Sequence, residues 1–108
     1  MLKYNPKRLN NAIVWFAKKH FEKTGKYPTL TQILKYLAFL EFESVKEWGI
    51  PAFGLKFKAY KHGPVPEEIY FKLKNLESTD PELYKLKKHD DHIVIIPVKE
   101  ADEDRFSV

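Results

Sequence analysis

Apolar residues near the start of the chain recur at the spacing of a helix that buries one face. Asn5 is a favourable N-cap, Pro6 suits the first helical position, and Gly25 provides a stop. We therefore expect a helix over residues 6–24. Its apolar stripe consists of Leu9, Ile13, Phe16, Ala17, His20 and Phe21. Trp15 lies off this stripe, so it is either covered by another part of the chain or available to a partner.

A second helix is predicted over residues 30–48. Thr29 and Gln32 have the spacing of a capping box before it, and Gly49 with Pro51 marks its end. The main stripe of this helix comprises Leu30, Ile33, Leu34, Leu37, Ala38, Glu41, Val45 and Trp48.

Two features of the second helix depart from a simple amphipathic pattern. Phe39 and Phe42 lie on the far side together with Lys35. Because a helix apolar on more than one face is usually central in its domain, a core position is favoured over an exposed interface for both phenylalanines. Glu41 lies on the apolar stripe, where a carboxylate must find hydrogen-bond donors or a cation. We interpret Glu41 as a buried bracket between this helix and the loop before the third helix, with a functional role as the alternative.

The second half of the chain changes period. Residues 55–61 alternate between apolar and polar types, as in a half-buried strand, and the stiff proline-rich loop 62–66 ends it. A third helix follows over 67–76, then a short helical turn over 80–86 and a strand over 92–98, which we expect to pair with the first strand. The fold class is therefore α+β and mainly helical, with three main helices and a small antiparallel sheet in a single domain.

Charged residues are numerous and unevenly placed. Lysine occurs 17 times and arginine twice; residues 1–88 carry 17 basic and 9 acidic side chains, whereas residues 89–108 carry 2 and 6. Arginine binds phosphate groups in a bidentate manner that lysine cannot match, and nearly all the basic residues here are lysines. A soluble surface typical of thermophilic proteins is therefore favoured over nucleic-acid binding. Residues 99–108 form an acidic tail within the domain 1–108. With no long apolar run and no signal peptide, we expect a cytoplasmic protein without membrane contact.

Few residues suit catalysis. The chain has no cysteine, its three serines lie in no nucleophile motif, and its four glycines form no phosphate-binding loop. The segment His89-Asp90-Asp91-His92 could ligate a divalent cation, but a solvated turn between helix and strand is favoured because a metal site needs fixed geometry. We expect no cofactor and no enzymatic activity.

A set of residues from the second helix to the third forms a recognisable pattern. A Leu-Lys pair and an acidic residue on the helix precede a Gly-Pro turn, a strand with an aromatic residue and Ala, and a Gly-Pro-Val-Pro segment that opens a helix. The residues that match are Lys35, Glu41, Gly54, Phe57, Ala59, Gly63, Pro64, Val65, Pro66 and Tyr70. Together with Ala12–Ala17 in the first helix, they make the chain resemble the SocA-like antitoxin, or Panacea, domain over roughly residues 9–107. Members of that family usually continue into further helices, so the chain resembles a C-terminally short member.

The resemblance implies a non-enzymatic antitoxin that neutralises a partner toxin, usually encoded beside it, by direct binding. Spare aromatic residues at Trp15, Phe39 and Phe42 are the candidate partner-binding positions, and self-association into a homo-oligomer is a further possibility. The alternative is a winged-helix-like DNA-binding regulator or adaptor, in which strand lysines such as Lys56 and Lys58 contact phosphates. The acidic residues of the second and third helices disfavour this alternative.

Overall fold

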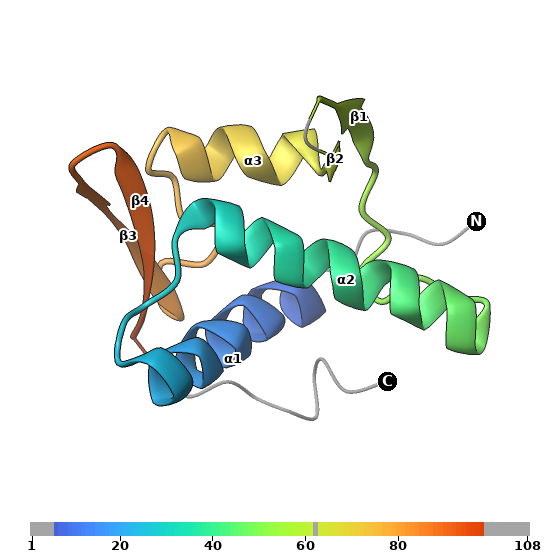
Figure 1. Cartoon of the computed structure of the whole chain (residues 1–108), viewed down its shortest axis with the longest axis horizontal. Helices are drawn as coiled ribbons and strands as arrows, with labels where there is room; N and C mark the ends of the chain where they lie inside the picture. Colours follow the sequence, from blue (N-terminus) through green and yellow to red (C-terminus); the bar gives the residue numbers. More distant parts are fainter. Residues whose placement is uncertain (1–5, 62, 99–108) are drawn as a thin grey trace.

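The computed structural model describes residues 6–61 and 63–98. Three helices and two antiparallel hairpins make up this part of the chain (Figure 1). In chain order they are α1 (Pro6–Thr24), α2 (Leu30–Trp48), β1 (Lys58–Tyr60), β2 (Gly63–Val65), α3 (Glu67–Lys74), β3 (Tyr84–His89) and β4 (His92–Pro97). The mainly helical α+β fold is confirmed, and α1 and α2 occupy the predicted ranges. The acidic tail, residues 99–108, lies outside the described residues.

Local hydrogen bonds explain where α2 begins and ends. Thr29 Oγ1 accepts from the backbone N–H of Gln32 (3.3 Å), and Gln32 Oε1 accepts from the backbone N–H of Thr29 (2.9 Å). The predicted capping box is thus confirmed. At the other end, the Gly49 N–H donates to the Val45 carbonyl (2.8 Å) and closes the last turn.

The strand pairing differs from the prediction. β1 pairs with β2, and β4 pairs with β3, so the predicted pairing of 55–61 with 92–98 is wrong. The expected helical turn over residues 80–86 is shorter than predicted. The Asp80 carbonyl accepts from the N–H of Leu83 (3.0 Å) and of Tyr84 (3.1 Å), and the chain enters β3 at Tyr84. The His89–His92 segment is accordingly a turn between two strands.

Short turns account for this pairing. His89 and His92 face each other across the ladder, so a two-residue loop joins β3 to β4. Asp90 in that loop has a φ of 54°, a left-handed conformation that Asp tolerates better than most residues. Closing a loop of two residues costs less conformational entropy than closing the connection of about 30 residues that the predicted pairing required.

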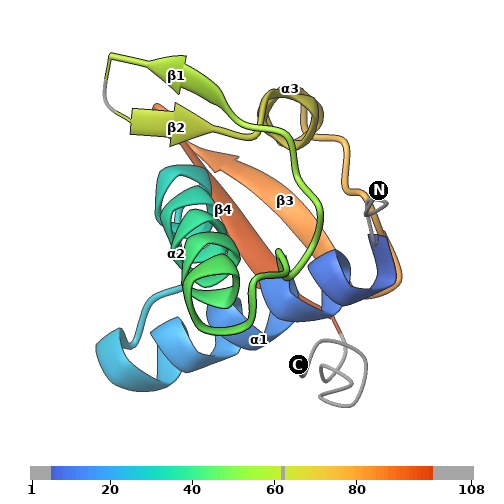
Figure 2. The ribbon, with the colours of Figure 1, turned by 90° about the vertical axis from the view of Figure 1, so that its right-hand side faces the viewer.

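α2 is the central element of the molecule. Figures 1 and 2 show α1 on one side of it and α3 with the β1–β2 hairpin on the other, while β4 packs against both α1 and α2. The core between these elements consists of fully buried side chains, which include Leu9, Ile13, Ile33, Leu37, Ile69, Leu73, Tyr84 and Ile95. Among the described residues, no helix is both long and apolar enough to cross a membrane.

Candidate functional site

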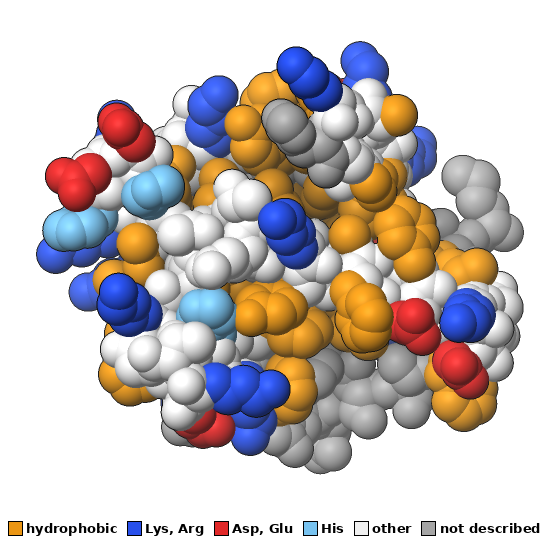
Figure 3. Space-filling model, in the orientation of Figure 1, with side chains coloured by type: hydrophobic (Ala, Val, Ile, Leu, Met, Phe, Trp, Pro, Cys, Tyr) orange, Lys and Arg blue, Asp and Glu red, His pale blue; other side chains and the backbone are white. Residues whose placement is uncertain are grey.

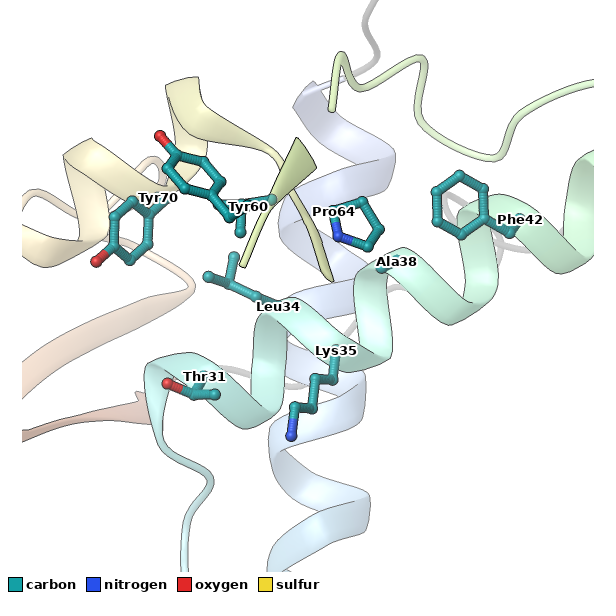
Figure 4. Close-up of a pocket in the computed structure, with 9 residues that line it drawn as sticks. Thr31, Leu34, Lys35, Ala38, Phe42, Tyr60, Pro64 and Tyr70 are labelled. Atoms are coloured by element: carbon teal, nitrogen blue, oxygen red, sulfur yellow. The ribbon is translucent and has the colours of Figure 1, made fainter. Parts of the chain in front are cut away.

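A groove of about 770 Å³ lies between α2, the β1–β2 hairpin and α3 (Figure 4). Its walls are mainly aromatic and aliphatic, with one ammonium group and a few hydroxyls. The lining residues are Thr31, Leu34, Lys35, Ala38, Phe42, Tyr60, Pro64, Val65 and Tyr70. We refer to this feature as the groove. Four of its residues, Lys35, Pro64, Val65 and Tyr70, belong to the family pattern identified in the sequence.

One face of α2 forms the first wall. Thr31, Lys35, Ala38 and Phe42 are spaced by four, three and four residues and therefore lie in line on the helix. The sequence analysis did not single out Thr31 or Ala38 as site residues, although this helical spacing is the signal that could have identified them. In Figure 4 the Lys35 side chain extends away from the hairpin, so its ammonium marks the outer rim of the groove.

The Gly-Pro-Val-Pro segment forms the second wall. Gly63 has a φ of 117°, which side chains other than glycine rarely adopt, so a glycine is required for the chain to reverse here. Pro64 is tolerated in β2 because both strands of a two-stranded sheet are edges. Pro66 is buried, and its carbonyl accepts the Tyr70 N–H (2.9 Å) to begin α3. The segment thus positions both the hairpin and Tyr70 beside α2.

Glu41 holds the chain that leads from α2 to the hairpin. The carboxylate is buried; Oε1 accepts from the backbone N–H of Phe53 (2.8 Å) and of Gly54 (3.4 Å), and Oε2 accepts from the N–H of Leu55 (2.8 Å). A positive φ of 79° at Gly54 helps three successive N–H groups to converge on one anion. The sequence predicted that the Glu41 carboxylate finds hydrogen-bond donors, and the donors are these three backbone N–H groups.

A polar cluster closes the hairpin against α3. The Tyr60 hydroxyl donates to Glu67, whose carboxylate also lies 3.9 Å from the ammonium of Lys58. The hydrogen bond to Glu67 raises the pKa of the Tyr60 hydroxyl above 10.0, because the bond exists only while Tyr60 keeps its proton. These contacts orient the Tyr60 ring at the wall of the groove.

The phenylalanines on the outer side of α2 are exposed. Phe39 is 64% exposed and Phe42 is 49% exposed, so the core position favoured from the sequence is wrong for both. The other elements cover the inner side of α2, where Ile33 and Leu37 are fully buried, and leave Phe39 and Phe42 on the outer side largely exposed. Phe42 has its ring centroid 5.1 Å from that of Phe57, which supports it from the strand side. Figure 3 shows hydrophobic side chains gathered over α2 and the adjoining hairpin.

Trp15 lies apart from the groove. It is half-buried on α1, with its ring 5.3 Å from Phe16 and 5.7 Å from the ammonium of Lys19. A separate hollow of about 190 Å³ adjoins it, where His20 Nδ1 and the Tyr36 hydroxyl are 2.7 Å apart. Of the three candidate partner-binding residues, the structure brings Phe39 and Phe42 together and leaves Trp15 on another surface.

Two further candidates, Ala59 and the His89–His92 turn, do not line the groove. Ala59 is exposed in β1, opposite Pro64. In the His89–His92 turn, His89 Nε2 lies 4.0 Å from Asp90 Oδ2, and both side chains are exposed. Within residues 6–61 and 63–98, no three His, Asp or Glu side chains are grouped as a metal ion would need.

The sequence pattern and the groove coincide with a known family. A family model described as "Antitoxin SocA-like, Panacea domain" matches residues 33–107, a stretch that contains all ten pattern residues. The match begins within α2, so the resemblance expected for Ala12–Ala17 in α1 lies outside it. No curated protein and no solved structure matches the chain. Because the match spans well over half of its length, the chain belongs to the SocA-like antitoxin family, whose members share the Panacea domain.

Proposed function

We propose that this protein is a cytoplasmic antitoxin that neutralises a toxin by direct binding and without catalysis. Membership of the SocA-like family supports a role in a toxin–antitoxin system. The proposal adds to this that neutralisation occurs by contact and that the contact surface lies on α2 and in the groove beside it.

The exposed apolar surface of α2 carries the proposal. Phe39 and Phe42 are 64% and 49% exposed on one side of α2, and Phe42 also lines the groove, so the outer face and the groove are continuous. Large exposed apolar patches mark interaction sites, and aromatic residues are enriched in protein interfaces. A protein partner that covered this face would remove several aromatic rings from water, and each buried ring contributes on the order of 1.5–3 kcal/mol.

Co-expression with the small reading frame beside the gene tests the proposal. The neighbouring product, expressed alone, is expected to stop growth; with this protein present, growth resumes and the two proteins purify as one complex. Absence of both rescue and co-purification would contradict the proposal.

A pair of variants ties the rescue to the proposed surface. Phe39→Asp places a charge at a largely exposed position, so it leaves the fold intact and weakens both rescue and co-purification. Lys87→Asp, at an exposed position on β3, changes the charge by twice as much and is expected to leave both unchanged.

A further inference from the structure

The outer face of α2 combines aromatic and basic residues in a fixed order. Lys35, Phe39, Phe42 and Lys46 are separated by four, three and four positions, so they share one face of the helix. At 1.5 Å per residue, the two lysines lie about 16 Å apart along the helix, with both phenylalanines between them. Among the described residues, neither lysine has an ion-pair partner.

The hairpin beside this face has the same sign of charge. Between Trp48 and Pro66 the chain contains Lys56, Lys58 and Lys61 and no Asp or Glu. The acidic residue that follows the hairpin, Glu67, bonds Tyr60 and pairs with Lys58, so much of its charge is compensated. Lysines therefore outnumber acidic residues at the rim, where Glu43 on α2 lies three residues before Lys46, and the interior is apolar.

We propose that the groove and the adjoining face of α2 receive an acidic, apolar segment of the partner protein. Its apolar side chains enter between Phe42, Tyr60 and Tyr70, and its carboxylates pair with Lys35 and Lys46. This inference rests on the proposed function for the identity of the partner as a protein. It adds the chemistry of the segment that is recognised: complementary charge steers association and excludes partners with basic surfaces.

Charge and composition disfavour two other occupants. A second copy in a twofold dimer presents the same face to itself, which brings the lysines of one copy toward those of the other. A nucleic acid gains little from exposed phenylalanines on a helix and favours arginine, whereas Arg8, the arginine among the described residues, donates to the Ala52 carbonyl (3.1 Å).

A defined peptide pair tests the inference without the toxin. The probe is a fluorescein-labelled peptide of 15 residues with Leu and Phe on one helical face and Glu on both flanks; its twin carries Lys in place of each Glu. The full chain is expected to bind the acidic peptide roughly tenfold more tightly than the basic twin at low salt, with the difference shrinking as salt screens the charges. Equal binding of both peptides, or tighter binding of the basic twin, overturns the inference.

Variants locate the site. The double variant Lys35→Glu/Lys46→Glu is expected to reverse the preference between the peptides, whereas Lys85→Glu/Lys87→Glu, on exposed positions of β3, keeps it. Phe39→Ala weakens binding of the acidic peptide roughly tenfold, and because Phe39 is largely exposed the substitution leaves the fold intact. If the α2 double variant keeps the preference, the segment binds elsewhere and the inference is wrong.

Competition distinguishes the remaining occupants. Displacement of the acidic peptide by an equal concentration of a 20-base-pair duplex DNA would assign the face to nucleic acid and overturn the inference. Peptide binding that weakens at protein concentrations where the protein dimerises would assign the face to a second copy and overturn it as well. The co-expression experiment tests the antitoxin role separately. If this protein rescues growth but shows no preference for the acidic peptide, this inference is refuted and the antitoxin role stands.

Discussion

At the scale of single residues, Glu41 shows how far an apolar stripe can be interpreted. A carboxylate on that stripe had to find donors, and the sequence predicted a bracket between α2 and a following loop. The donors themselves, the N–H groups of Phe53, Gly54 and Leu55, could not be identified in advance. The left-handed conformation of Gly54 helps them to converge, and a single glycine in a sequence does not reveal its φ.

Glu41→Gln is expected to destabilise the fold by about 2–3 kcal/mol, because hydrogen bonds to a charged acceptor contribute about 1.5–3 kcal/mol each. The amide offers one oxygen in place of two and turns an NH₂ group toward a backbone donor, so at least one buried N–H loses its partner. Urea denaturation measures the loss. Glu47→Gln, at an exposed position of the same helix, is the matched control and is expected to change stability by less than about 0.5 kcal/mol. Equal stability of the two variants would show that the bracket contributes nothing.

At the scale of elements, the helices could be predicted from sequence and the strand pairing could not. Helix bounds depend on local chemistry, such as the Thr29–Gln32 capping box and Gly49, which is visible in the sequence. Pairing depends on which segments lie side by side. The stretch 84–89, with three lysines and one histidine in six residues, has too little apolar alternation to indicate a strand. Residues 84–89 form a strand because Tyr84 is buried in the core and β4 pairs with them.

Tyr84 holds the β3–β4 hairpin against α1 and gives the hairpin a pH dependence. Its hydroxyl accepts from the Thr79 N–H (3.0 Å) and lies 2.6 Å from Thr79 Oγ1, which itself bonds Asn10 on α1. Burial raises the pKa of the Tyr84 hydroxyl above 10.0, while the hydrogen bonds from Thr79 oppose this in part. The folded state thus favours the protonated form. Its stabilising contribution is complete below the unfolded-state pKa and is lost as pH rises above about 10.

Tyr84→Phe is therefore expected to have two effects. At pH 7 it destabilises the fold by about 1–2 kcal/mol, because the partly buried N–H of Thr79 loses its acceptor. Between pH 9 and about pH 11 the variant is expected to lose stability less steeply than the unmodified protein, since it has no hydroxyl to ionise. Urea unfolding at a series of pH values checks both effects. Tyr70→Phe, a half-buried tyrosine at the groove, serves as control, and parallel pH curves for Tyr84→Phe and the unmodified protein would contradict the explanation.

At the scale of the whole molecule, the candidate site consists of residues that the sequence presented separately. Lys35 and Pro64 were singled out as residues of the family pattern and Phe42 as a spare aromatic residue, and the folded chain places all three around one groove. Its existence could not be predicted, because it depends on how the Gly-Pro-Val-Pro hairpin packs beside α2. The exposure of Phe39 was missed for a related reason: apolar residues around a helix indicate a central position, but not whether every face is covered.

The exposed face also governs how the molecule behaves without a partner. Phe39 and Phe42 on the outer face of α2, together with Val45 and Trp48 near its C-terminal end, favour self-association through apolar contact, whereas the net charge of +4 opposes it. Salt screens the repulsion between charges, and sulfate also strengthens apolar burial. We therefore expect the chain to be mainly monomeric at low salt and to associate as sodium sulfate is raised, which light scattering at several protein concentrations measures. The double variant Phe39→Ser/Trp48→Ser is expected to remain monomeric over the same range. A monomer at every salt and protein concentration would contradict this expectation and show that apolar contact at this face is too weak to hold two copies together.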